Sequence, residues 1–587
     1  MPFAFEHDLS EEILDYIVSS CSQGSKAALC RCSKKTNRIA TPHLYHAVHF
    51  QASTGGACLL WLLPFAHLIF TSPTHASFVR SFTSEDGWSD DMAPKERDEG
   101  VELGEEDKRP WPGSGTAELE EALKKTCATH TTDEGKATSL YDRLRGGENE
   151  GDIVALLLAS FPNLRELDLR YGSYTSGMIE VLEGAVKCAK SRGNFRSDLM
   201  EYTGNSKPAS LSPTPFSQPL DMLVSGTEDK YPNDPRYLAV FLNLPNLRSL
   251  YGWMFGDEGT LADQRYDSFT RLKPRSCPVE YIECRTCKFH PDNLKSMMNA
   301  TIPGKLKTFL YEIGCAWAWV DVQNAEIMMS LEPHYETLEC LGLSHEEFYP
   351  YQFTNDNEEA DPVSLRCFKS LKRLKIAPVF IFGHDGFTES ELRKDSTKEM
   401  LWKALPHTLE ELWISRAQGQ EEEKDATVKF VPDCFIPALN LLVVNRESFP
   451  LLTQFRIDLP IKDWEVDWLD QLASFCHFAE NNGIRCKIIT TGALGGKYAV
   501  HRYSQRKWGW DEDVEWAPCE NNLTKFALWI DVAEQHDLGD TLRSLWNEGH
   551  LEDARDDSEQ DGEEDNQESY ADEDEENLGE ERKDEDK

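Results

Sequence analysis

The chain has 587 residues, of which 40% are hydrophobic and 10% aromatic, so it can fold but is too long for a single hydrophobic core. Its formal net charge of -42 argues against binding nucleic acid or anionic membranes, because phosphate binding depends on clustered Lys and Arg. The 16 cysteines show no dense disulfide spacing, and the amino terminus shows no secretory signal, so we expect an intracellular protein of the cytoplasm or nucleus.

Residues 1–50 predict a small helical domain. Apolar side chains at helical spacing form one stripe of a helix over residues 10–20: Leu9, Ile13, Leu14 and Ile17. A second helical stretch begins at Ala27, and we expect Pro42 to end it because proline lacks the backbone donor. Residues 51–83 then form a linking or capping segment. Its apolar run over residues 57–70 predicts a buried helix or a strand pair and is too short to span a bilayer.

Three segments have the composition of irregular structure. Residues 84–150 are acidic and rich in glycine, which predicts a disordered insertion with one short helix over residues 117–125. Residues 191–235 form a second insertion, because prolines and serines there exclude regular structure. Residues 551–587 hold 20 Asp or Glu against 4 Lys or Arg, which predicts a disordered acidic tail.

A repeated L-x-x-L-x-L phrase dominates the middle of the chain. It occurs as LRELDL (residues 164–169), LECLGL (338–343), LKRLKI (371–376) and LEELWI (409–414). The central apolar residues of these and similar phrases are Leu167, Leu250, Ile282, Phe309, Leu341, Leu374, Leu412 and Leu442. Apart from the first interval, they recur about every thirty residues, a length that fits one strand, one helix and two loops.

This period predicts an α/β solenoid over residues 151–500. Each strand would pair in parallel with its neighbours, with a curved sheet on the inside and the helices on the outside. Helical spacing over residues 293–300, 325–331 and 469–480 supports the outer layer, and residues 484–489 predict a last strand. Residues 501–550 would then form a carboxyl-terminal cap.

Two stretches near the amino terminus resemble an F-box. These are LSEEILDYI (residues 9–17) and ALCRCSKKTNRIATP (28–42), the latter followed by Leu44 and Tyr45. Ser10 stands where the family usually has proline, and Thr36 where it usually has an aromatic residue. The downstream repeats, including FPNLREL (161–167) and LPNLRSL (244–250), are similar to the irregular leucine-rich repeats of fungal F-box proteins.

The resemblance implies a substrate-receptor subunit of a cullin-based ubiquitin ligase. In that family the F-box binds the Skp adaptor, while the repeats hold a protein substrate. The positions that would share the adaptor surface and the domain's own core are Leu9, Ile13, Leu14, Ile17, Leu29, Cys32 and Ile39. The alternative interpretation is a helical cap that closes the solenoid of a scaffold without adaptor binding.

Cys284, Cys287 and His290, with Cys277 nearby, raise the alternative of a zinc site, because thiolate and imidazole are preferred zinc ligands. A leucine-rich repeat accounts for the same residues, with Ile282 and Cys284 facing the core. No second C-x-x-C completes a four-ligand set, so we predict no metal. We also find no nucleophile elbow, phosphate-binding loop or dinucleotide fingerprint, and therefore predict no catalytic residue and no cofactor.

Tryptophans beside the predicted strands are the candidate substrate-binding residues, namely Trp317, Trp319 and Trp413. The competing interpretation places them in the core, since large aromatic side chains dominate burial. The negative charge of the chain leads us to expect a basic protein partner. Three hypotheses remain: a ligase substrate receptor, an interaction scaffold outside any ligase, and a zinc-dependent protein.

Overall fold

The computed structural model divides the chain into two compact units, Met1–His536 and Asp537–Lys587. All residues that the structure describes lie in the first unit. They are residues 9–50, 58–84, 117–131, 133–146, 150–170, 178–187, 216, 218–225, 235–257, 269, 271–314, 320, 322–345, 362–383, 393–415, 430–460, 469–491 and 527–531. The predicted acidic tail therefore lies outside the described residues, as does most of the predicted carboxyl-terminal cap.

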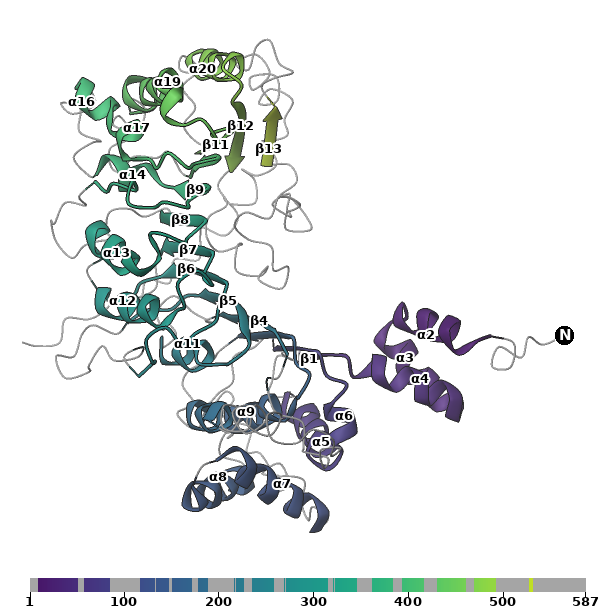
Figure 1. The fold of residues 1–587 in the computed structure, drawn as a ribbon. Coiled ribbons are helices and arrows are strands. Elements are labelled where there is room, and N and C mark those ends of the chain that lie inside the picture. The colour runs from purple at the N-terminus through teal and green to yellow at the C-terminus, as the bar shows by residue number, and fades with distance from the viewer. Residues whose placement is uncertain are drawn as a thin grey trace, which may run out of the picture. The chain divides into compact units, whose positions relative to one another are not determined.

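Three helices form the amino-terminal domain (Figure 1): α2 (Glu11–Ser19), α3 (Gln23–Cys32) and α4 (Lys34–Leu44). A serine precedes each helix, and its side chain accepts a hydrogen bond from a backbone N–H of the first turn. Leu14, Val18, Ile39 and Ala40 form the buried core between α2 and α4. Contrary to the prediction, α4 continues through Pro42. Pro42 removes one backbone hydrogen bond, the one to the Arg38 carbonyl, and the helix ends two residues later at Leu44.

The described strands form one sheet whose spatial order follows the chain order from β1 to β13. Strands β1 to β12 are parallel to their neighbours, and β13 pairs antiparallel with β12. The strands are β1 (Ala47–Phe50), β2 (Ser81–Ser84), β3 (Glu166–Arg170), β4 (Leu220–Ser225), β5 (Leu247–Trp253), β6 (Tyr281–Cys287), β7 (Thr308–Ile313), β8 (Cys340–His345), β9 (Arg373–Ile376), β10 (Glu411–Ile414), β11 (Gln454–Pro460), β12 (Arg485–Thr491) and β13 (Ala527–Asp531).

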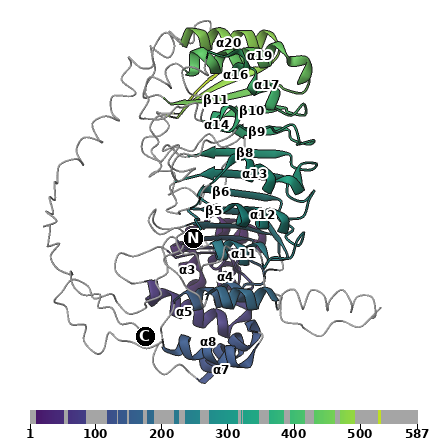
Figure 2. The same cartoon turned by 90° about the vertical axis from the view of Figure 1, so that its left-hand side faces the viewer.

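Most connections between strands contain helices, and from α11 onward these lie together on one face of the sheet (Figure 2). They are α11 (Pro235–Leu242), α12 (Pro291–Ala300), α13 (Asn324–Ser330), η1 (Glu332–His334), α14 (Pro378–Phe382), α16 (Asp395–Lys398), α17 (Met400–Ala404), η4 (Val431–Phe435), α19 (Ile436–Val444), η5 (Arg446–Ser448) and α20 (Leu469–Asn481). One strand per repeat, stacked in parallel with the return helices on one side, is the architecture of a leucine-rich-repeat solenoid. The α/β solenoid prediction is thus confirmed for this part of the chain.

Seven of the eight predicted repeat markers lie in strands of the sheet, and six of them pair with one another. Leu167 is separated from Leu250 by Met222 of β4. Leu250 lies beside Ile282, which lies beside Phe309, and the series continues through Leu341, Leu374 and Leu412. The eighth prediction is wrong, because Leu442 is a buried residue of helix α19 and the strand of that repeat is β11. A short apolar run such as residues 436–444 cannot be assigned to strand or helix from periodicity alone.

The sequence also predicts too little structure near the two insertions. Within residues 191–235, the strand β4 pairs with β3 and β5, so one repeat is hidden among the prolines and serines. Residues 117–146 form two helices, α7 (Ala117–His130) and α8 (Glu134–Gly146), where we expect only a short one. Their few apolar residues, among them Leu123, Cys127 and Leu144, are buried, and α7 packs against α8 and against helix α5 (Cys58–Thr71). Sparse apolar residues at helical spacing are thus enough to fold this segment.

Two further helices lie nearby in the chain, α6 (Pro73–Ala76) and α9 (Glu150–Ser160).

Candidate protein-interaction surfaces

The two faces of the sheet differ in what covers them. Leu250, Ile282 and Phe309 are buried on the helix-covered face, and a Cβ placed on Gly252 would contact Leu238 of α11. The alternate residues point to the opposite face, because successive side chains of a strand alternate. We call this second face the inner face. No helix that the structure describes in the repeats lies on it, and it is the candidate binding surface of the sheet.

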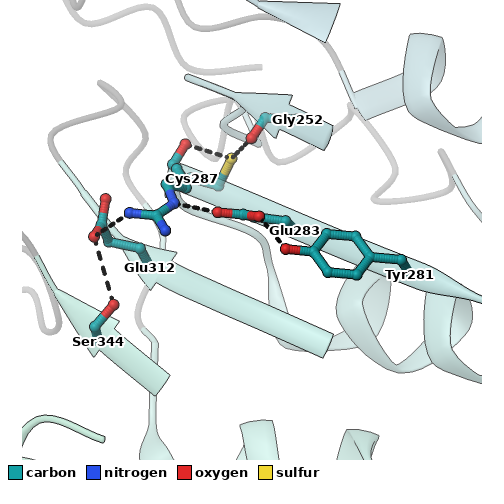
Figure 3. Close-up of polar contacts among 7 residues, drawn as sticks. Gly252, Tyr281, Glu283, Cys287, Glu312 and Ser344 are labelled. Carbon is teal, nitrogen blue, oxygen red and sulfur yellow. Dashed lines mark hydrogen bonds and ion pairs between the residues drawn. The ribbon is translucent and has the colours of Figure 1, made fainter. Parts of the chain in front are cut away.

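A polar network lies on the inner face of β6, β7 and β8 (Figure 3). The Tyr281 hydroxyl donates a hydrogen bond to the Glu283 carboxylate, which also accepts one from Arg285 Nε. Arg285 Nη1 lies 3.6 Å from Glu312 Oε2, and the Ser344 hydroxyl lies 3.5 Å from the same oxygen. Glu283 and Arg285 are buried, so each charge depends on its partner for stabilisation. Burial, followed by the Glu283 charge, raises the pKa of Tyr281 well above its usual value, so the phenol stays a donor at neutral pH.

Backbone irregularity in β6 accompanies this network. The pairing of β6 with β7 shifts between Cys284 and Cys287, and Thr286 has a φ of 54°. Cys287 is anchored in the bulge: its thiol lies 3.0 Å from the Arg285 carbonyl oxygen and 3.9 Å from that of Gly252, and its sulfur accepts a hydrogen bond from Phe255 N at 3.4 Å. A positive φ is costly for a β-branched residue and is retained where the surrounding contacts impose it. The bulge thus fixes the backbone next to Arg285.

An apolar cluster lies beside the polar network on the inner face. Leu310, Cys340 and Trp413 pack together, and Tyr281 packs against them. Gly342 leaves room for this packing, because a Cβ there would lie only 2.6 Å from Leu310 Cδ2. The Lys375 ammonium lies 4.3 Å from the Trp413 ring centroid, a cation–π geometry.

The inner face is only partly accessible to solvent. Its central side chains, including Glu283, Leu310 and Trp413, are buried. Toward β3, Glu166 is exposed, and Asp168, Tyr251, Tyr281 and Glu312 are half-buried. The rings of Tyr251 and Tyr281 lie side by side with their centroids 5.0 Å apart. The accessible side chains at this end of the face are therefore aromatic and acidic. Farther along the same row, Arg373 of β9 is half-buried and Arg485 of β12 is exposed.

The three predicted substrate-binding tryptophans have different outcomes. Trp413 lies on the inner face, as expected for a binding residue, but it is only 2% exposed and packs within the apolar cluster. Trp317 and Trp319 lie outside the described residues. Glu283, Arg285 and Glu312 were not predicted as site residues, although they alternate along the strands with the buried Ile282, Cys284 and Ile313.

Some of the residues predicted to contact the adaptor are buried in the core of the domain, and others are accessible to solvent. Leu14 and Ile39 are buried in the domain core, while Leu9, Ile17 and Leu29 are half-buried and Cys32 is exposed. Ile13 is 49% exposed, and Tyr16, three residues later on the same side of α2, is 75% exposed. The exposed apolar surface of the domain therefore includes Ile13 and Tyr16.

Both departures from the F-box pattern have local structural roles. Ser10 is the N-cap of α2, so a capping serine starts the helix where the family usually has proline. Thr36 is buried and forms a capping box with Ser33: Ser33 Oγ accepts from Thr36 N, and Thr36 Oγ1 accepts from Ser33 N, each at 3.1 Å. A hydroxyl at position 36 thus stabilises the start of α4, a contact that an aromatic ring cannot provide.

The cysteines proposed as zinc ligands lie in the interior of the repeats. Cys277, Cys284 and Cys287 are buried, and Cys284 lies on the core face as the repeat interpretation requires. His290 is the N-cap of α12 and accepts a hydrogen bond from Asp292 N. Among the described residues, no group of three or more His, Cys, Asp or Glu side chains is placed to hold a metal ion.

None of the helices that the structure describes is both long enough and apolar enough to cross a membrane.

Comparisons with known proteins give only limited similarity. No family model matches the chain. The Protein SDS23 of Debaryomyces hansenii is 29% identical over 189 residues, a stretch that spans 31% of this chain and 31% of that protein. The crystal structure of a TLR13–ssRNA13 complex aligns with 51% of this chain and 30% of its own chain at 14% identity, with a TM-score of 0.24. A TM-score this low does not establish a common overall fold, so the assignment of the solenoid depends on the strand topology itself.

Proposed function

We propose that this protein is a non-catalytic interaction scaffold that binds a basic segment of a partner protein on the inner face of its sheet. The observation that carries the proposal is the series of parallel strands from β3 to β7, one face of which is covered by none of the described helices of the repeats. Tyr251 and Tyr281 are half-buried there, the state in which aromatic side chains serve as anchors at protein interfaces.

Charge favours a basic partner at this end of the face. Glu166, Asp168 and Glu312 lie on the accessible part, and Arg285, the nearest described cation on β6, is engaged by two carboxylates. The whole chain carries -42, so its long-range field also attracts a basic segment. We therefore expect binding that weakens as salt concentration rises.

Affinity capture with the full chain as bait tests the inner face. Glu166→Lys and Tyr251→Ala should each lose the partners that wild type recovers, because they change the charge and the aromatic anchor of the surface. Glu166 is exposed, so its substitution should leave the fold intact. Glu336→Lys is the matched control, since Glu336 is exposed and remote from the strands' inner face. Equal recovery by all variants and wild type would show that the partners bind elsewhere.

We further propose that the scaffold is a substrate receptor of a cullin-based ubiquitin ligase. The F-box resemblance of residues 9–42 motivates this, and the exposed Ile13 and Tyr16 supply an apolar surface that a Skp-type adaptor would cover. Substrate held on the sheet would then have a raised effective concentration near the charged conjugating enzyme. The protein itself would contribute no catalytic group.

Coexpression with the Skp adaptor separates a ligase receptor from a scaffold outside any ligase. Ile13→Asp should abolish copurification of the adaptor while the domain stays folded, because Ile13 is largely exposed. Leu14→Asp is unsuitable for this test, since Leu14 is buried and its loss would unfold the domain. Lys295→Asp, an exposed substitution in α12, should leave adaptor recovery unchanged. If wild type recovers no adaptor, the ligase proposal fails and the scaffold proposal stands.

A further inference from the structure

The residue that precedes most strands of the repeats is charged, and we call this row of side chains the charge ladder. Backbone hydrogen bonds join its neighbours: Glu280 N donates to Arg248 O at 2.8 Å, and Lys307 N donates to Glu280 O at 2.9 Å. Neighbouring strands are about 4.8 Å apart, so consecutive side chains lie next to each other. The sign of the charge alternates at every step over Arg248, Glu280, Lys307, Glu339, Lys372 and Glu410. In β4 this position is Leu220, and Asp221 lies one residue further on, opposite Glu166.

Side chains of the charge ladder form ion pairs between neighbouring repeats. Arg248 binds the Asp221 carboxylate in a bidentate manner: Nε donates to Oδ1 at 2.8 Å, and Nη2 donates to Oδ2. Glu339 lies between Lys307 and Lys372, with nitrogen–oxygen distances of 2.6 and 2.8 Å. The charges in this part of the ladder are thus largely neutralised within the chain.

The alternation fails at the amino-terminal end. Arg80 N donates to His46 O at 2.9 Å, and Arg165 N donates to Arg80 O at 2.8 Å, so three basic side chains occupy consecutive steps. The Arg80 guanidinium donates only to the carbonyl oxygens of Ser77 and Asn163, each at 3.3 Å. Arg165 is exposed and forms no ion pair with any residue in the described part of the chain, because Asp221 is engaged by Arg248.

The basic side chains at this end of the ladder repel one another. Burial and then the Arg165 charge lower the pKa of Arg80. Burial, followed by Arg80 and His43, lowers the pKa of His46, and Lys26 of α3 adds a further positive charge, while Glu166 acts in the opposite direction. A bound anion would relieve this repulsion, and planar guanidinium groups are well suited to carboxylates.

We propose that Arg80 and Arg165, with His46 beside them, form a docking site for an acidic peptide segment of a partner protein. The site adjoins the inner face at β3, where Arg165 precedes Glu166, but it does not depend on the function proposed above. A short acidic segment fits better than a nucleic acid, because the basic steps span only three neighbouring strands and the net charge of -42 repels a longer polyanion. The chain therefore has two docking surfaces of opposite charge preference.

Fluorescence anisotropy of a labelled oligo-glutamate peptide with the full chain tests the site. Arg165→Glu should weaken binding by about tenfold, because it replaces one charge-assisted contact with repulsion. Arg366→Glu is the matched control: it makes the same charge change at an exposed position remote from the ladder's first steps, and its affinity should stay within about twofold of wild type. Arg165 is exposed, so Arg165→Glu should keep a Tm close to that of wild type. A Tm measured beside the affinity separates lost binding from lost folding.

Two results would overturn the proposal. Equal affinities of Arg165→Glu and Arg366→Glu, or no binding by wild type, would show that the basic steps hold no acidic peptide. Tighter binding of a single-stranded RNA that is lost in Arg165→Glu would assign the site to nucleic acid instead. An oligo-glutamine peptide should show no binding to any of the proteins.

Discussion

Glu339 lies between two lysines of the neighbouring repeats, and these contacts make it the clearest titratable contributor to stability. Hydrogen bonds from Lys307 and Lys372 lower the pKa of the Glu339 carboxyl to about 2, against an ordinary value of 4.5. Because the folded pKa is the lower one, the contribution is complete above pH 4.5 and is lost as the pH falls toward 2. We expect Glu339→Gln to lower the free energy of unfolding at pH 7 by about 1 kcal/mol, since solvent weakens partly exposed ion pairs.

Urea denaturation of wild type and Glu339→Gln at pH 7 and pH 3 measures this effect. The difference between the two proteins should shrink at the lower pH. Glu336→Gln, at an exposed position without an ion pair in the described structure, is the control and should match wild type at both pH values. A pH-independent difference would mean that Glu339 acts through packing instead of charge.

Gly342 is the residue on which the apolar cluster of the inner face depends. A Cβ there would lie 2.6 Å from Leu310 Cδ2, and Leu310 is itself buried against Cys340 and Trp413. Gly342→Ala should therefore destabilise the protein by about 1–3 kcal/mol through overpacking. In a double-mutant cycle measured by urea denaturation, Leu310→Ala should relieve part of this cost. Strictly additive effects would show that the two side chains do not compete for space.

Individual residues could be placed from the sequence only where the repeat pattern determined their position. The pattern correctly puts Cys284 on the core face and Trp413 on the inner face. It cannot show that Trp413 is buried, because that depends on Leu310 and Cys340 from other repeats. The charge ladder was also readable in principle, since Arg165, Glu339 and Lys372 each follow the first leucine of a phrase. Its significance depends on which repeats are adjacent in space.

Helix α4 depends on its amino-terminal capping box. Ser33→Ala removes one of the two reciprocal hydrogen bonds with Thr36 and should lower the stability of the amino-terminal domain by about 1 kcal/mol. Hydrogen exchange should show faster exchange in α4, with the strands of the solenoid unchanged. Ser25→Ala, an exposed substitution within α3, is the control. Unchanged exchange in α4 would mean that the cap contributes nothing measurable.

Most strands of the repeats could be predicted from the sequence, whereas β1, β2, β4, β11 and β13 were not predicted. The strands β1, β2 and β4 lack the full phrase, and β4 lies among residues whose composition indicates irregular structure. Such strands form because a neighbouring strand already offers a paired edge and a shared core, information that local sequence does not contain. The helices α7 and α8 were underestimated for a similar reason, since packing between α7, α8 and α5 stabilises them.

Because the repeats are stacked one after another, the proposed binding surfaces lie on different parts of the chain. Each repeat contacts mainly its neighbours, so a surface at one position of the solenoid can change without disturbing the buried pattern elsewhere. The proposed adaptor surface lies on α2, and the proposed partner surface lies on β3 to β7. Substitutions in the two should therefore act independently, as expected for distant sites.

Capture of the chain on immobilised Skp adaptor, followed by quantification of the partner protein that it carries, tests both proposed surfaces in one experiment. We expect wild type to be retained together with its partner, Ile13→Asp not to be retained, and Glu166→Lys to be retained without the partner. A wild-type chain that is not retained would contradict the ligase proposal. A Glu166→Lys chain that carries as much partner as wild type would contradict binding on the inner face.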